Sequence, residues 1–209
     1  MAEIAAGPEH CAYCFSVLVK AVGHPLSHER ADTTPGFADV ASPLFVTWNT
    51  QLSADAVRLR GCIGTFEPLP LRRALAEYAA TAALRDPRFP PVTASELASL
   101  QCGVSLLVNF SPRERWDDWT IGVHGIRIRF ALSPGGPLSG TATFLPEVAA
   151  EQGWTRFETL EHLLRKGGYH GPITAAVLDA VELTRYESSK ATMAFRDYEA
   201  YLKAHPEAS

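Results

Sequence analysis

Strand-like segments of this sequence follow one another in pairs without an intervening helix, and this order constrains the fold more than any other feature. Residues 44–48 (LFVTW) and 56–64 (AVRLRGCIG) form the first pair, joined by the polar stretch NTQLSAD. Residues 119–132 predict a β-hairpin that turns near His124 and Gly125, with apolar side chains alternating against arginines. Neighbouring strands of this kind pair antiparallel, whereas a doubly wound sheet needs a helix between its strands. We therefore predict an α+β fold with a mostly antiparallel sheet and flanking helices.

Helices are predicted where apolar residues recur every three or four positions. Residues 9–22 place Cys11, Cys14, Phe15 and Leu18 on one apolar face. The other predicted helices are 69–84, 93–100, 146–152, 155–166 and 195–205, and the other predicted strands are 103–110, 141–145 and 180–188.

Composition excludes several classes of protein. A chain of 209 residues with 46% hydrophobic and 20% charged residues is typical of a folded protein with one large domain or two small lobes. A net charge of −4 argues against a general nucleic-acid binder, which usually carries a basic excess. No segment approaches the roughly 20 consecutive apolar residues that span a bilayer, and the first residues do not resemble a secretory signal. Four unevenly spaced cysteines indicate free thiols in a reducing compartment, so we expect a cytoplasmic location and leave a nuclear one open.

The octapeptide LRGCIGTF contains the first candidate site. In an extended strand, Arg58, Arg60 and Cys62 would point to one side of the sheet, while Leu59 and Ile63 would face the core. A guanidinium close to a thiol favours the thiolate, which is the nucleophilic form of cysteine. This strand is therefore the best candidate in the chain for a nucleophile or an anion-binding site.

The neighbouring glycines and two other residues complete the candidate site. Gly61 and Gly64 would let a ligand or a strained turn approach the backbone closely. The alternative is that Cys62 is a small buried hydrophobe and that the glycines only turn the chain. Nucleophilic catalysis also needs a base, for which His124 is the candidate, unless it is a histidine tolerated in a turn. Glu147 is a candidate ligand-binding and orienting carboxylate, or a charge that stabilises a helix start.

The C-x-x-C spacing of Cys11 and Cys14 can hold zinc or form a redox pair. No second pair of this spacing occurs, and both thiols lie on the apolar face of the predicted helix. Core packing is the preferred interpretation, and we expect neither a metal nor a cofactor.

Several motifs occur in one order along almost the whole chain, from about Cys11 to Tyr201: LRGCIGTF, DPRFPP, IGVHGIRI, TATFLPEVAAEQGW, LLRKGGY and LTRYESSK. Together they resemble the AMMECR family, and the starting segment CAYCFSVL is similar to eukaryotic members. The resemblance implies a single AMMECR-type domain over residues 1–209. The composition of the segments near 23–43 and 133–140, rich in Gly, Pro and Ser, predicts flexible loops, and there the chain departs from the family. The resemblance also implies two unequal lobes with a cleft between them, where the LRGCIG motif lies.

The resemblance implies a binding or catalytic site at this motif but no particular reaction. In the first hypothesis, a small anionic ligand binds in the cleft, held by Arg58 and Arg60, with Cys62 as nucleophile and His124 moving the proton. In the second, the chain is a non-catalytic adaptor or regulatory module for a protein partner, such as the Memo-like proteins linked to prokaryotic relatives. Neither nucleic acid nor a membrane is expected as a partner, and whether the chain is an enzyme stays open.

Overall fold

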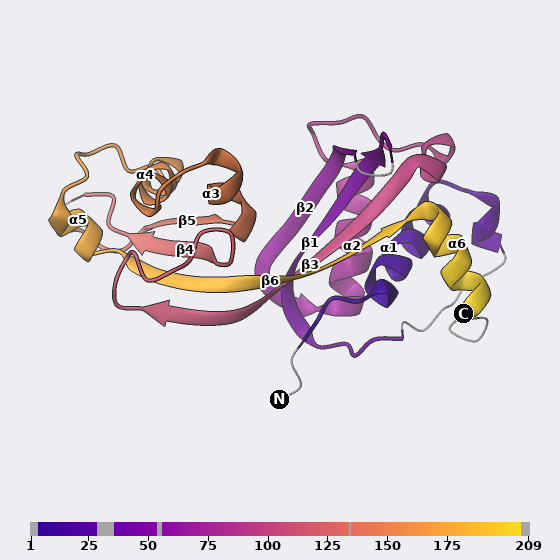
Figure 1. The fold of residues 1–209 in the computed structure, drawn as a ribbon, viewed down its shortest axis with the longest axis horizontal. Helices are drawn as coiled ribbons and strands as arrows, with labels where there is room; N and C mark the ends of the chain where they lie inside the picture. Colours follow the sequence, from indigo (N-terminus) through magenta and orange to yellow (C-terminus); the bar gives the residue numbers. More distant parts are fainter. Residues whose placement is uncertain (1–3, 29–35, 54–55, 134, 206–209) are drawn as a thin grey trace. The chain divides into compact units, whose positions relative to one another are not determined.

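The computed structural model describes residues 4–28, 36–53, 56–133 and 135–205 (Figure 1). The chain divides into two units, one built from residues 1–106 and 189–209 and the other from residues 107–188. The strands are β1 (Ala41–Gln51), β2 (Val57–Pro70), β3 (Leu100–Arg113), β4 (Gly125–Phe130), β5 (Gly140–Phe144) and β6 (Glu182–Ala194). The helices are α1 (Pro8–Ala21), α2 (Leu71–Leu84), α3 (Pro146–Gln152), α4 (Arg156–Lys166), α5 (Ala175–Asp179) and α6 (Phe195–Ala204), with short 3₁₀ helices η1 (Pro25–His28) and η2 (Ala94–Ser99).

The strands follow the order β2-β1-β3-β6-β4-β5 in one sheet. The pairs β1–β2, β1–β3, β4–β5 and β4–β6 are all antiparallel. The predicted α+β class with an antiparallel sheet and flanking helices is confirmed. The predicted cleft between two lobes stays a prediction.

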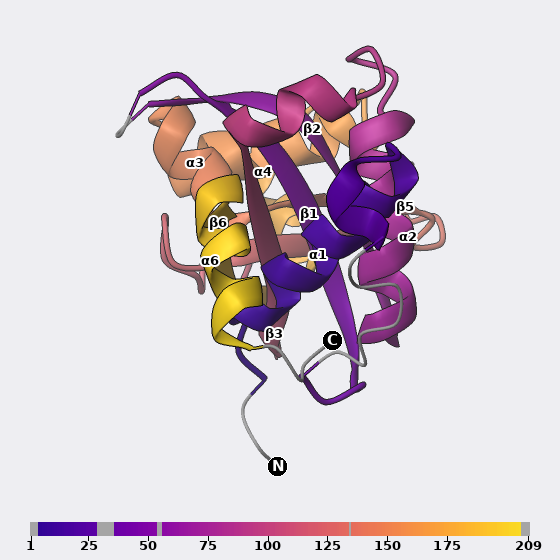
Figure 2. The ribbon, with the colours of Figure 1, turned by 90° about the vertical axis from the view of Figure 1, so that its right-hand side faces the viewer.

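In the first unit, α1 and α2 pack together on one side of β1 and β2, and α6 packs on α1. Figure 2 shows α1 between α6 and α2, in front of β1. Phe15 of α1 contacts Trp48 of β1 edge-on, with ring centroids 5.0 Å apart, and stacks on Tyr198 of α6 at 5.1 Å. The indole N–H of Trp48 donates to the carbonyl oxygen of Ala79 at 3.0 Å, so the polar atom of this buried ring is satisfied.

The predicted apolar face of α1 is confirmed. Cys11, Cys14, Phe15 and Leu18 are all fully buried in the core of the first unit. Both cysteines are free, and the Sγ of Cys11 donates to the carbonyl oxygen of Ala191 at 3.4 Å. The C-x-x-C spacing therefore serves core packing, as the sequence indicated.

In the second unit, α3 and α4 pack against β4 and β5 (Figure 1). The alternation predicted for β4 is confirmed, because Ile126, Ile128 and Phe130 are buried whereas Arg127 and Arg129 are exposed. The helix α5 was not predicted.

The predicted hairpin over residues 119–132 is wrong. Only β4 is a strand in this segment, and it pairs with β5 and β6. The residues before it form turns, in which the backbone N–H of His124 donates to the carbonyl oxygen of Thr120 at 2.9 Å. The side chain of Trp119 is buried in the core of the unit, and its indole N–H donates to the carbonyl oxygen of Trp116. These local contacts use the backbone groups that a strand ladder would need.

The predicted flexible loops at 23–43 and 133–140 include residues 29–35 and 134, which lie outside the described residues. The described parts of these segments contain η1 and the first residues of β1 and β5. No helix in the described part of the chain combines the length and the apolar character that crossing a membrane requires.

Candidate functional site

The LRGCIG motif lies in β2, and a β-bulge at Arg60 interrupts the pairing of this strand with β1. The residues before and after Arg60 follow two registers that differ by one residue. This shift places Leu59 and Cys62 on the same face of the sheet and Arg58 on the opposite face. The prediction that Arg58, Arg60 and Cys62 share one side is therefore wrong. Leu59 is 40% exposed instead of facing the core, whereas Ile63 packs against the core as predicted.

Arg60 is a buried residue that fixes the motif to the neighbouring loop. Its guanidinium forms two hydrogen bonds with the carboxylate of Glu96, with Nε–Oε1 at 2.9 Å and Nη2–Oε2 at 3.4 Å. Its Nη1 donates to the carbonyl oxygen of Pro90 at 2.8 Å. The hydrogen bonds from Arg60 hold the pKa of Glu96 below its usual value. These contacts assign Arg60 a structural role, and its predicted role as an anion ligand is untested.

The two glycines of the motif stand where the chain's own backbone comes close. A Cβ atom at Gly61 would collide with the carbonyl oxygen of Ala82, at the end of α2. A Cβ atom at Gly64 would collide with the carbonyl oxygen of Leu44 and the ring of Phe45. Packing of α2 and β1 therefore accounts for both glycines, and the predicted contact with a ligand is not needed to explain them.

The backbone of Cys62 is held on both sides by the loop that follows α2. The carboxylate of Asp86 accepts a hydrogen bond from the N–H of Cys62 at 2.9 Å. The Nη2 of Arg88 donates to the carbonyl oxygen of Cys62 at 3.0 Å. Because β2 is the outermost strand of the sheet, the N–H and the carbonyl oxygen of Cys62 would otherwise be unpaired at an open edge. The two side chains of the DPRFPP segment cap this edge at the cysteine.

Asp86 and Arg88 also form an ion pair with each other. The Nη2 of Arg88 lies 2.7 Å from Oδ2 of Asp86, whose side chain is almost completely buried. The hydrogen bond from Arg88, followed by that from the Cys62 backbone, holds the pKa of Asp86 well below its usual range although burial opposes this. The Arg88 side chain is 53% exposed, so this cation is partly open to solvent beside the motif.

The thiol of Cys62 differs from the other three in its surroundings. Cys62 is half-buried, and its Sγ accepts a hydrogen bond from Oγ1 of Thr47 at 3.2 Å. Cys11, Cys14 and Cys102 are fully buried in the core of the first unit, and burial raises the pKa of Cys102 well above its usual value. Among the four cysteines, Cys62 is the one that is not buried.

His124 belongs to the second unit, at the end of the turn before β4. Its Nδ1 accepts a hydrogen bond from the backbone N–H of Thr120 at 2.9 Å, which places the proton of the neutral ring on Nε2. The Nε2 atom lies 4.0 Å from Oε1 of Glu187. Burial, followed by the charge of Arg185, lowers the pKa of His124. The acceptor nitrogen that a general base would use is therefore occupied by the turn.

Glu147 also belongs to the second unit, in the first turn of α3. A carboxylate at this position is favoured by the helix N-terminus whether or not a ligand is present. The structure thus explains Glu147 by its helix, and its predicted role toward a ligand is untested.

The structure brings together residues that the sequence reasoning did not. Asp86, Arg88 and Thr47 surround Cys62, whereas the sequence offered DPRFPP as a family motif without a contact to the cysteine. An Asp-x-Arg pair directly after an amphipathic helix was the available signal. Within the described residues, no three histidine, cysteine or acidic side chains gather closely enough to hold a metal ion.

Comparison with known proteins identifies the family. The model of the AMMECR1 family matches residues 11–191. The chain belongs to the AMMECR1 family. An uncharacterised protein of Arabidopsis thaliana is 44% identical over 203 residues, covering 96% of this chain and 91% of that protein. An uncharacterised protein of Schizosaccharomyces pombe is 37% identical over 190 residues, covering 91% and 94%.

A solved structure shares the fold of this AMMECR1-family chain. The crystal structure of an uncharacterised protein from Pyrococcus horikoshii superposes with a TM-score of 0.63 and 24% identity, covering 88% of this chain and 91% of that one. At this identity the likeness concerns the fold.

Proposed function

We propose that this AMMECR1-family chain binds a small anionic ligand at the sheet face that carries the Cys62 thiol. One observation carries the proposal: Asp86 and Arg88 hold the backbone of Cys62 on both sides, while Cys62 itself is only partly buried. A cysteine kept only for its volume would not need this degree of fixation, nor a position that is only partly buried.

Part of the face around the thiol is polar, although Leu59 and Phe45 lie on the same side of the sheet. Thr47 and Asn49 of β1, paired with Gly103 and Gln101 of β3, lie on the same side of the sheet as Cys62. All five residues are half-buried, and Nδ2 of Asn49 donates to Oε1 of Gln101 at 3.4 Å. Hydroxyl, amide and thiol groups on one face suit a polar ligand better than an apolar one.

Arg88 supplies the cation of the proposed site. Its Nε and Nη2 are engaged by Asp86 and Cys62, but its Nη1 makes no hydrogen bond within the described residues. A guanidinium with one free edge can bind a carboxylate or phosphate oxygen of a ligand. Any covalent chemistry of a thiol on this face would use the Sγ of Cys62, since the other three cysteines are buried.

The experiment measures whether small anions protect Cys62 from alkylation. Native protein is treated with iodoacetamide in the presence of phosphate, citrate, pyruvate or malonate, and the modified fraction of Cys62 is read by mass spectrometry. We expect at least one anion to slow alkylation in the wild type and in Arg58→Gln, whose side chain lies on the opposite face. We expect this protection to be lost in Arg88→Gln. Absence of protection by every anion, or equal protection in Arg88→Gln, would overturn the proposal.

A second candidate function is the adaptor module. Three apolar side chains are exposed where β1 ends and β2 begins, with exposed fractions of 60% for Leu52, 48% for Val57 and 40% for Leu59. Exposed apolar side chains that lie close together favour a contact with a protein partner, because the contact removes them from water. A purified Memo-like protein should then bind in calorimetry, and Leu59→Ser should weaken that binding while Cys62→Ser leaves it unchanged. The opposite ranking of the two variants would argue against the adaptor.

A further inference from the structure

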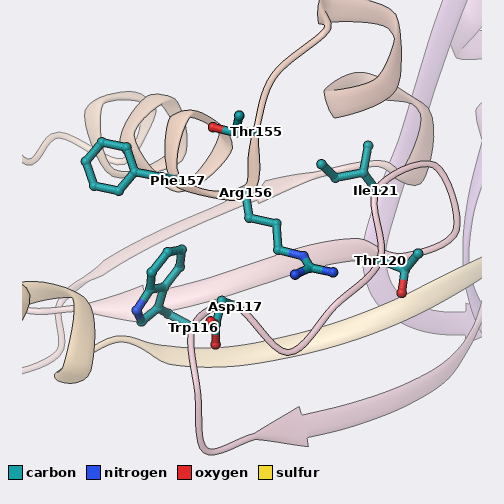
Figure 3. A pocket seen from close by; sticks show the side chains of 7 residues that line it. All are labelled: Trp116, Asp117, Thr120, Ile121, Thr155, Arg156 and Phe157. Atoms are coloured by element: carbon teal, nitrogen blue, oxygen red, sulfur yellow. The ribbon is translucent and has the colours of Figure 1, made fainter.

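The second unit carries a groove that no part of the proposed site uses. It has a volume of about 570 Å³ and lies between the loop before β4 and the start of α4 (Figure 3). We name it the Trp116 groove. The residues that line it include Trp116, Asp117, Thr120, Ile121, Arg156 and Phe157.

Aromatic side chains form one wall of the Trp116 groove. The rings of Trp116 and Phe157 meet edge-on, with centroids 6.4 Å apart. Phe157 is 44% exposed, although a side chain of this kind usually finds a place in the core. Figure 3 shows both rings on one side of the groove and Ile121 on the other. An apolar body between them would remove all three side chains from water.

One cation without a hydrogen-bond partner lies in the same groove. Figure 3 shows the guanidinium of Arg156 between the two walls. The nearby carboxylate of Asp117 is already engaged by Arg115, at 2.7 and 2.9 Å. Within the described residues, Arg156 makes no hydrogen bond or ion pair of its own, although the charge of Asp117 is near enough to interact with it, so its N–H groups are free to bind a ligand. This places one positive charge over a mostly apolar surface.

The start of α4 does not supply a competing anion site. The Oγ1 of Thr155 accepts from the N–H of Glu158, and the carboxylate of Glu158 accepts from the N–H of Thr155 at 2.8 Å. This capping box already provides hydrogen-bond acceptors for backbone N–H groups at the N-terminus of α4. An anion in the groove would therefore depend on Arg156.

From these features we infer that the Trp116 groove binds an apolar monocarboxylate, with its apolar body between Trp116, Phe157 and Ile121 and its carboxylate on Arg156. One guanidinium can form two parallel hydrogen bonds with one carboxylate. The hydroxyl of Thr120 is the additional polar group at the edge of the groove. Two sources have this chemistry: a free aromatic acid, and the C-terminal residue of a peptide that ends in an aromatic side chain.

The test uses the four tryptophan indole N–H signals of the nitrogen-15-labelled full chain. The signal of Trp116 is assigned with Trp116→Phe, and naphthoate is titrated against its neutral amide. We expect naphthoate to shift the Trp116 signal with a Kd of about 1 mM, because a ligand of this size gains about 0.3 kcal/mol per heavy atom. The amide should bind about fivefold more weakly. Trp48, buried in the first unit, should not respond.

Two variants decide whether Arg156 recognises the carboxylate. Arg156→Gln should make acid and amide equal, whereas Arg129→Gln, at another exposed arginine of the unit, should keep the difference. Acetyl-Gly-Phe and its amide form the second arm: stronger binding of this acid than of naphthoate assigns the site to a peptide end, and the reverse assigns it to a free acid. No shift of Trp116 up to about 10 mM naphthoate, or equal binding of acid and amide in the wild type, would overturn the inference.

Discussion

The carboxylate of Asp86 and the backbone N–H of Cys62 are joined by a hydrogen bond of 2.9 Å, which connects the two most distinctive motifs of the chain. The same carboxylate binds Arg88, which in turn donates to the carbonyl oxygen of Cys62. The LRGCIG strand and the DPRFPP loop are therefore one structural unit. Asp86 and Arg88 hold the backbone of β2 at Cys62, and the thiol of Cys62 is the group that they leave available to a ligand.

Removal of the Asp86 carboxylate should destabilise the fold. Asp86→Ala deprives Arg88 and the Cys62 N–H of their buried partner, and we expect a loss of about 2–3 kcal/mol in the free energy of unfolding. Urea unfolding measures this loss. Asp117→Ala is the matched control, because Asp117 binds Arg115 two residues away with a side chain that is 28% exposed, against 1% for Asp86, and it should change stability less. Similar effects of the two substitutions would contradict the role given to Asp86.

The same carboxylate predicts how stability depends on pH. The pKa of Asp86 is lower in the folded chain than in the unfolded chain, where it is about 3.9. Its stabilisation is therefore complete above that value and is lost as the pH falls below it. We expect the difference in unfolding free energy between wild type and Asp86→Asn to shrink between about pH 5 and about pH 2. A difference that stays constant over this range would show that the charge of Asp86 is unimportant.

Gly61 should be more sensitive to substitution than a glycine in open space. In Gly61→Ala the new methyl group meets the carbonyl oxygen of Ala82, so β2 and α2 must separate, at a cost of about 2 kcal/mol or more. Gly153→Ala introduces a residue at φ +68° with open space around it, and should cost about 1 kcal/mol. Thermal and urea unfolding of both variants test this order, and a reversed order would refute the close approach.

His124 should be neutral and should carry its proton on Nε2 at neutral pH. Its Nδ1 accepts from Thr120, and burial lowers its pKa below about 6.5. Because the unfolded chain takes up the proton more readily, this histidine destabilises the fold as the pH falls below that value. Nitrogen chemical shifts of the ring report both the tautomer and the pKa. A protonated Nδ1, or a pKa above about 6.5, would restore His124 as a candidate base.

Sequence periodicity predicted much of the fold, because the apolar face of α1 and the alternation in β4 are local patterns. The capping signals of η2 and α4 are equally local, and the structure contains both capping boxes. The hairpin over residues 119–132 failed because the residues before β4 form turns, and it is from such a turn that Trp119 is buried in the core of the second unit. Apolar spacing alone does not distinguish such a turn from a strand.

The candidate site was predicted only in part. Cys62 was identified from its motif, but strict alternation could not reveal the bulge at Arg60, because a bulge depends on pairing with another strand. Asp86 and Arg88 contact Cys62 across 24 and 26 residues of sequence. A sequence separation of this size carries no periodic signal, so the partners of the cysteine became visible only in the structure.

The measurement that tests the central claim most directly is the alkylation of each cysteine in the native protein by iodoacetamide at neutral pH, resolved by mass spectrometry. The account predicts that Cys62 alone is modified, since it is the one cysteine that is not buried, and that the three buried cysteines react only after the protein is unfolded in denaturant. If Cys62 stays as unreactive as Cys11, Cys14 and Cys102 until unfolding, its thiol is packing, and the ligand site proposed around it is wrong.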